Sequence, residues 1–307
     1  MTDDIQIGAL VSIGELARST GLAVRTIRFY CDEGILESRR SAGGHRMFDA
    51  GSATERLLLV RRLRALGLGL GSITDVLQGD RSIAEAIAAE SARLDTEFRS
   101  LAWRRAALRA LETAAPMQRT ERLVLLADAP DGGVAHDCLL RFWQRILAPL
   151  PRSDIDMWVC WNVPEPPADP SIDEVVAYAE LAALAADPEL HKVVRHQYWR
   201  NQPELIRNPR GLYADVGDVM TAVVPLVSEG VRPRSGDELD RYVKAHASAR
   251  GECDSPRFRE QLLIDATDTD RRIRQYWALT GQFFGTRITV GQAHNWVYDA
   301  LTHSAEL

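Results

Sequence analysis

The fold of this chain is decided by residues 13–77. This stretch begins with IGELA (13–17), passes through VRTIRFY (24–30) and GGHRMF (43–48), and closes on RRLRALG (61–67). Ser12 precedes an apolar-periodic run and Glu15 follows three residues later, which is the capping-box pattern of a helix start. Gly21 can end that helix, because glycine readily adopts the left-handed conformation.

A second helix is expected over residues 24–33. Val24, Ile27 and Cys31 recur at helical spacing and are expected to face inward, which leaves Arg25, Thr26, Arg28 and Tyr30 on the other faces. Two short helices joined by a glycine-containing turn predict a helix-turn-helix, whose second helix can lie in a DNA major groove. A helical hairpin with solvated arginines would give the same two helices, so the residues that follow must decide.

The next segment predicts a β-hairpin wing. Arg39 and Arg40 lead into a flexible tip at residues 41–44, and residues 45–48 return as a short extended run. A third helix is expected from about residue 49 and a fourth over residues 70–77. The third helix should turn these apolar residues inward: Leu57, Leu58, Val60, Leu63 and Leu66.

The charge is distributed unevenly along the chain. The net charge is −6, but residues 13–78 hold ten Arg and seven Asp or Glu, whereas residues 113–307 hold 21 Lys or Arg and 28 Asp or Glu. A mildly basic head on an acidic remainder fits a protein that touches DNA with one end.

Composition excludes several other classes. With 46% hydrophobic residues the chain can build real cores. It has no apolar run approaching ~18 residues and no apolar signal region after Met1–Asp4, so we expect a cytoplasmic protein without a membrane span. The four cysteines are scattered, which disfavours a disulfide framework or a zinc ribbon. No metal and no cofactor are expected.

The order of these motifs closely resembles the N-terminal domain of MerR-family transcription regulators, over about residues 11–112. The resemblance implies a winged helix-turn-helix dimer whose second helix and wing contact double-stranded DNA. Phe29 stands where tyrosine is frequent, and Ala23 where a serine or threonine would cap the second helix, a loss of ~1 kcal/mol. The residues to which the resemblance assigns DNA contacts are Arg25, Thr26, Arg28, Phe29, Tyr30, His45, Arg46 and Arg64.

Residues 80–114 predict one long helix. Apolar residues recur every seven positions, which favours a coiled coil over a single amphipathic helix lying on its own domain. The resemblance implies that this helix pairs with its twofold mate, so we expect a homodimer on pseudo-palindromic promoter DNA, acting with RNA polymerase. The cysteines of metal-sensing and iron–sulfur relatives are absent from both ends of the helix. The predicted dimer contacts are Ile87, Leu94, Phe98, Leu101 and Leu108.

Residues 115–307 predict an all-α domain, with one short strand at Met157–Trp161. They hold six of the seven tryptophans, which could line a site for a small aromatic or cationic ligand or simply form the core. Asp265, Asp268 and Asp270 are interpreted as a solvated helix face. No motif of an enzyme is present. The candidate ligand-binding residues are Trp143, Trp199, Trp277 and Trp296.

The expected fold is therefore mainly α: a winged helix-turn-helix head (1–79), a coiled-coil dimerisation helix (80–114) and an all-α effector domain (115–307). Two alternatives remain open for the last part. It could dock a protein partner in a ligand-independent repressor or activator, or it could be an enzyme domain fused to a DNA-binding head.

Overall fold

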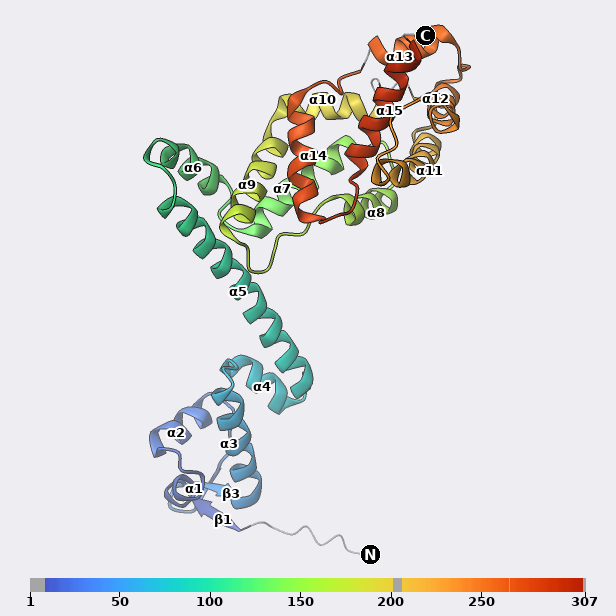
Figure 1. Cartoon of the computed structure of the whole chain (residues 1–307). Coiled ribbons are helices and arrows are strands. Elements are labelled where there is room, and N and C mark those ends of the chain that lie inside the picture. Colours follow the sequence, from blue (N-terminus) through green and yellow to red (C-terminus); the bar gives the residue numbers. More distant parts are fainter. Residues whose placement is uncertain (1–8, 201–205, 265, 306–307) are drawn as a thin grey trace, which may run out of the picture. The chain divides into compact units, whose positions relative to one another are not determined.

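The computed structural model describes residues 9–200, 206–264 and 266–305, so Met1–Asp4 and Asp265 lie outside the described residues. Within these ranges the fold is mainly α with one small sheet, as predicted. The chain divides into two compact units, with the boundary in the sequence between Glu97 and Phe98; Figure 1 shows the elements of each.

The first unit is the head. Its elements are β1 (Leu10–Ser12), α1 (Ile13–Thr20), α2 (Val24–Asp32), β2 (Arg39–Arg40), β3 (Arg46–Asp49), α3 (Ala50–Ala65) and α4 (Leu70–Gln78). The sheet is antiparallel with the order β1-β3-β2, and Arg40 pairs with Arg46 across the wing. The sequence predicted the wing but not β1, which adds a third strand by pairing Val11 with Phe48.

Local signals fix the start of the head. The Ser12 hydroxyl accepts from the Glu15 backbone N–H, and the Glu15 carboxylate accepts from the Ser12 backbone N–H at 2.8 Å, so the predicted capping box is present. Gly21 ends α1 with φ at +70°. The core beneath the helices includes Leu16 and Ile27, both fully buried.

Two side chains of the head differ from the sequence prediction. Tyr30, placed on an outer face of α2, is only 8% exposed and belongs to the core. Leu66, expected inside, is 65% exposed, because α3 ends at Ala65 and Leu66 already lies in the turn that follows. Leu57, Val60 and Leu63 are buried as predicted.

The long helix α5 (Ile83–Glu112) is shared between the two units. Ser82 and Glu85 form a capping box at its start. Ala86 packs into the core of the head, whereas Trp103 and Ala106 pack into the core of the second unit. The Trp103 indole N–H donates to the Ala129 carbonyl at 3.0 Å, which anchors the second half of the helix.

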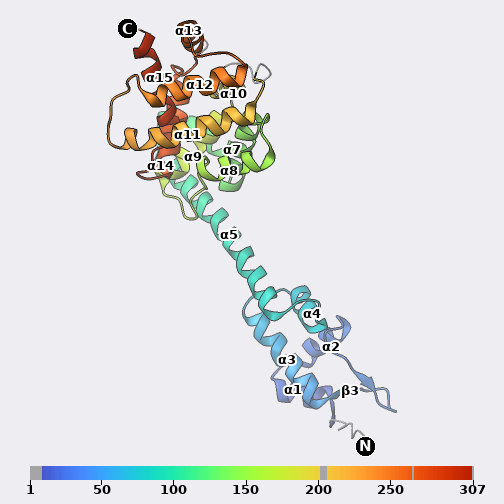
Figure 2. The ribbon, with the colours of Figure 1, turned by 90° about the vertical axis from the view of Figure 1, so that its right-hand side faces the viewer.

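The second unit is built of helices joined by loops, with no strand among its described residues (Figure 2). Its elements are α6 (Pro116–Asp128), α7 (Gly132–Ile146), α8 (Arg152–Asn162), α9 (Ile172–Ala186), α10 (Pro188–Trp199), α11 (Pro209–Ser228), α12 (Asp237–Arg250), α13 (Pro256–Ile264), α14 (Arg271–Phe283) and α15 (Val290–Ala305). A large aromatic core joins α7, α9, α10 and α14, and a smaller core joins α11, α12, α13 and α15.

The strand predicted at Met157–Trp161 was wrong, because these residues lie inside α8. A short apolar run does not distinguish a strand from a helix. The solvated face proposed for the aspartates was also wrong: Asp268 is 3% exposed, and Asp270 caps α14 by accepting from the Arg272 N–H at 2.8 Å.

One helix, α11, has the length and composition of a membrane span among the residues that the structure describes. Its Leu212 is part of the large core, and Val219 and Val223 are part of the smaller core that it shares with α12 and α15. Asp215 and Asp218 interrupt its apolar surface. We therefore interpret α11 as a packed helix of the second unit.

Candidate nucleic-acid interface

Helix α2 presents a charged surface above a buried anchor. Ile27 and Tyr30 fix the helix to the core, which leaves Arg25, Arg28 and Phe29 exposed. Phe29, 44% exposed, leans on Tyr30 with ring centroids 5.9 Å apart. The helix starts at Ala23 without a side-chain cap, as the sequence predicted.

The wing adds a second group of cations. Arg39 and Arg40 are exposed on β2, and the tip closes through a hydrogen bond from the Ser41 N–H to the His45 carbonyl at 2.9 Å. His45 is exposed at this tip. The wing therefore offers arginines in extended backbone next to a small, exposed turn.

Arg46 already has a partner in the free protein. Its guanidinium donates to the Asp32 carboxylate at the end of α2 at 2.9 Å. This hydrogen bond raises the pKa of Arg46 above its ordinary value. The ion pair ties the wing to α2, and a phosphate would have to share or replace the carboxylate.

The arginines of α3 have structural partners that the sequence did not reveal. Arg61 donates to the Thr20 carbonyl at 3.0 Å and so holds the end of α1. Arg64 donates to the Leu68 carbonyl at 2.9 Å and closes the turn after α3. Both side chains remain exposed, so each can present further N–H donors to an anion.

The structure thus keeps most of the predicted DNA contacts at the surface of one small unit, and it buries Tyr30. Arg25, Arg28 and Arg40 form no ion pair with a carboxylate among the described residues, and Arg39 interacts with Asp49 only through its charge. Free guanidinium groups of this kind suit the phosphates of a DNA backbone. This arrangement defines a winged helix-turn-helix with a basic surface.

Comparison of the sequence with known protein families identifies the class of the head. A model of MerR helix-turn-helix regulatory proteins matches residues 11–80, so this segment is a MerR-family DNA-binding domain. Nodulation protein NolA of Bradyrhizobium elkanii is 36% identical over 107 residues, which are 34% of this chain and 48% of that protein.

NolA of Bradyrhizobium diazoefficiens is 37% identical over 86 residues, or 28% of this chain and 36% of that protein. The chain thus spans about half or less of the length of these relatives, and the likeness is confined to the N-terminal third. No solved structure matches this chain.

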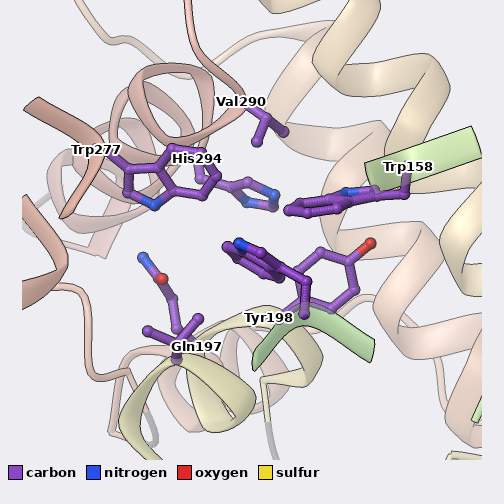
Figure 3. A pocket seen from close by; sticks show the side chains of 8 residues that line it. Trp158, Gln197, Tyr198, Trp277, Val290 and His294 are labelled. Carbon is purple, nitrogen blue, oxygen red and sulfur yellow. The ribbon is translucent and has the colours of Figure 1, made fainter. Parts of the chain in front are cut away.

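Two of the four candidate ligand-binding tryptophans meet in an aromatic cage in the second unit. The cage is formed by Trp143, Trp158, Tyr198 and Trp277, and the ring centroids of Trp143 and Trp158 are 4.1 Å apart (Figure 3). The space left between the side chains is about 10 Å³, which is roughly one water molecule. The cage is therefore filled by its own rings.

The other two tryptophans are anchored in the core. The Trp199 indole N–H donates to the Ile146 carbonyl at 2.7 Å, and the Trp296 indole N–H donates to the Val231 carbonyl at 2.8 Å. Both rings are buried. Among the four predicted tryptophans, Trp277 alone also borders a wider opening.

His294 lies at the edge of the cage (Figure 3). Its Nδ1 is buried and has no hydrogen-bond partner among the described residues. Burial, helped by the nearby charge of Arg200, lowers its pKa to about 4. At neutral pH the ring is therefore uncharged.

A buried ion pair lies close to the cage and was not predicted from the sequence. Arg200 pairs with Asp268, and both side chains are 1% exposed. Gln197 donates to Asp268 at 2.9 Å, and Arg200 donates to the Tyr242 hydroxyl at 2.8 Å. Arg200 adopts φ of +53°, a conformation that costs a non-glycine residue energy, so its surroundings must hold it there.

Proposed function

We propose that this chain is a homodimeric, sequence-specific transcription regulator of the cytoplasm that binds promoter DNA through its head. The observation that carries the proposal is the set of exposed arginines on α2 and the wing of a MerR-family domain. In this proposal Arg28 and Arg46 contact phosphates, and Arg25 and Thr26 face the base edges.

The dimer is supported by the surface of α5. Its predicted contact residues are all exposed in the single chain, between 41% for Ile87 and 60% for Leu108. Large apolar side chains repeated every seven residues are stabilised when a second helix covers them. We therefore infer that a second copy covers this face, and that the DNA site is pseudo-palindromic.

Control of transcription would then follow the mechanism that the family resemblance implies. The dimer would bend and untwist the promoter so that RNA polymerase can use it, at a deformation cost on the order of a few kcal/mol. An effector bound in the second unit would favour one state of the dimer. The wider opening beside Trp277 supports a ligand in this unit.

Salt-dependent binding to the chain's own upstream DNA tests the DNA contacts. Arg28→Ala and Arg46→Ala should weaken binding to all sequences and reduce the salt slope by about one each. Changes at Arg25 or Thr26 should alter the preferred sequence instead. Arg234→Ala is the control, because Arg234 is an exposed residue of the second unit. Unchanged affinity of the Arg28 and Arg46 variants would contradict the assignment.

A second function for the C-terminal unit is favoured by the surface of α6. Met117 is 95% exposed, and Leu123 and Val124 are 53% and 59% exposed. Exposed apolar groups on one helix suit a protein partner. If Met117→Gln with Val124→Gln abolished promoter activation but left dimer and DNA binding intact, docking of a partner would be supported over ligand control.

A further inference from the structure

A wide groove opens on the second unit beside Trp277. It is lined by α14, the loop that follows and the first turns of α15. Its volume is about 470 Å³, within the range of about 300–1,000 Å³ that is typical of small-molecule sites. Unlike the closed aromatic cage, this groove has room for a ligand without any movement of the protein.

The charged residues that line the groove are all positive. Its lining contains Arg274 and Arg287 and no carboxylate. Neither arginine has a carboxylate within 4 Å among the described residues, although residues 113–307 carry a net charge of −7. Two unpaired arginines in an otherwise acidic unit create a local site for an anion.

Arg287 is held in place by its neighbours. Its guanidinium lies 4.4 Å from the centroid of the Phe284 ring and 5.7 Å from that of Trp161. One N–H also donates to the Trp161 carbonyl. Because an arginine has five N–H donors, this anchoring fixes the side chain and leaves donors for a ligand.

The remaining walls supply amides and apolar surface. Gln292 uses its Oε1 to accept from the Thr289 N–H at 2.8 Å, so its amide nitrogen is left as a donor. Ala278 and Ile288 provide the apolar part of the lining, next to the buried Trp277. The groove therefore combines donors for an anionic group with a small apolar surface.

Trp277 is fixed by a glycine of α15. A side chain at Gly291 would overlap the Trp277 ring, so the backbone of α15 lies directly on it. The same residue also lines the aromatic cage, and it is only 6% exposed. Trp277 is thus a buried residue that borders both the cage and the groove.

We propose that this groove binds a small organic anion with a planar apolar body, such as an aryl carboxylate. Arg274 and Arg287 attract the carboxylate, and the apolar body lies against Ala278 and Ile288. The assignment rests on the proposed role of the second unit as an effector domain, and it replaces the cationic ligand with an anionic one, because two arginines repel a cation.

Calorimetric titration of the full-length protein without DNA tests the site. The probes are benzoate, 2-naphthoate and biphenyl-4-carboxylate, each paired with its neutral primary amide. At least one acid should bind about tenfold more tightly than its amide. Arg274→Gln and Arg287→Gln should each weaken binding of the acid about five- to tenfold and leave the amide unchanged, since a hydrogen bond to a charged group is lost.

Arg234→Gln is the matched control, because Arg234 is an exposed arginine of the same unit outside the groove. The site assignment would be overturned if none of the acids bound, if acid and amide bound equally, or if the control weakened binding as much as the groove variants. Promoter activity with the bound acid is measured separately: binding without any change in transcription would refute effector control and leave the site itself standing.

Discussion

Replacement of Asp268 by asparagine should destabilise the second unit severely. The variant keeps the size of the side chain but removes the negative charge that faces Arg200, and both side chains are 1% exposed. Arg200 would then keep its charge in the core without a carboxylate, with the neutral Tyr242 hydroxyl 2.8 Å from its Nε. Removing one member of a buried ion pair costs about 3–5 kcal/mol.

That loss converts into a clear change in melting temperature. For a unit of this size, 1 kcal/mol corresponds to about 2–4 °C, so Asp268→Asn should lower the Tm by roughly 6–20 °C. The intrinsic fluorescence of the buried tryptophans reports the unfolding of this unit. Asp299→Asn, in an exposed aspartate of α15, is the matched control and should change the Tm by no more than 1–2 °C.

The double variant Arg200→Met with Asp268→Leu tests the cause. It leaves no unpaired charge, so it should be more stable than Asp268→Asn alone, because buried pairs can often be replaced by apolar groups at little cost. If Asp268→Asn lost less than about 1 kcal/mol, or if the double variant were the less stable of the two, the reasoning from an isolated buried charge would be wrong.

Three further predictions concern the head, the dimer and pH. Asp32→Asn should strengthen DNA binding a few-fold in salt titrations, because it frees Arg46 and removes a carboxylate that repels phosphate; weaker binding would show that the ion pair positions the wing. Leu94→Glu should convert the dimer into monomers in analytical ultracentrifugation, whereas Ala92→Glu, one face away on α5, should not; a dimeric Leu94→Glu would contradict the proposed seam. Burial lowers the pKa of His294 in the folded protein to about 4, below its ordinary value of 6.5. The unfolded chain therefore binds the proton first, and the free energy of unfolding decreases as the pH is lowered from about 6.5 to 4. From pH 7 to 5, denaturant titration should show a loss about 2 kcal/mol larger in the natural protein than in His294→Gln; equal losses would refute the role of this histidine.

The head was largely predictable because its signals are local. The Ser12 and Glu15 capping box, the left-handed Gly21 and the periodic core of α3 each depend on residues within a few positions. Tyr30 was misplaced because α2 has only nine residues, and so short a helix leaves its inward face poorly defined by periodicity. The strand β1 has three residues and exists only because β3 pairs with it.

The second unit was less predictable because its important contacts are distant in sequence. Arg200 and Asp268 are 68 positions apart, and no spacing rule connects them. The helix α8 was taken for a strand because its apolar run is short, and the break between α13 and α14 has no proline or glycine to mark it. The groove brings together Arg274 and Arg287 from a helix and a loop, so the sequence shows two ordinary arginines.

The missing cap at Ala23 has a consequence for how α2 could meet DNA. A serine there would occupy the first N–H groups of the helix with its own hydroxyl. With alanine, the N–H groups of Val24 and Arg25 have no hydrogen-bond partner among the described residues, and a helix N-terminus attracts anions. If α2 docks as proposed, Ala23→Ser should stabilise the free head and lower its affinity for DNA. An uncapped helix start would then lower the stability of the free head and leave N–H groups available to a phosphate.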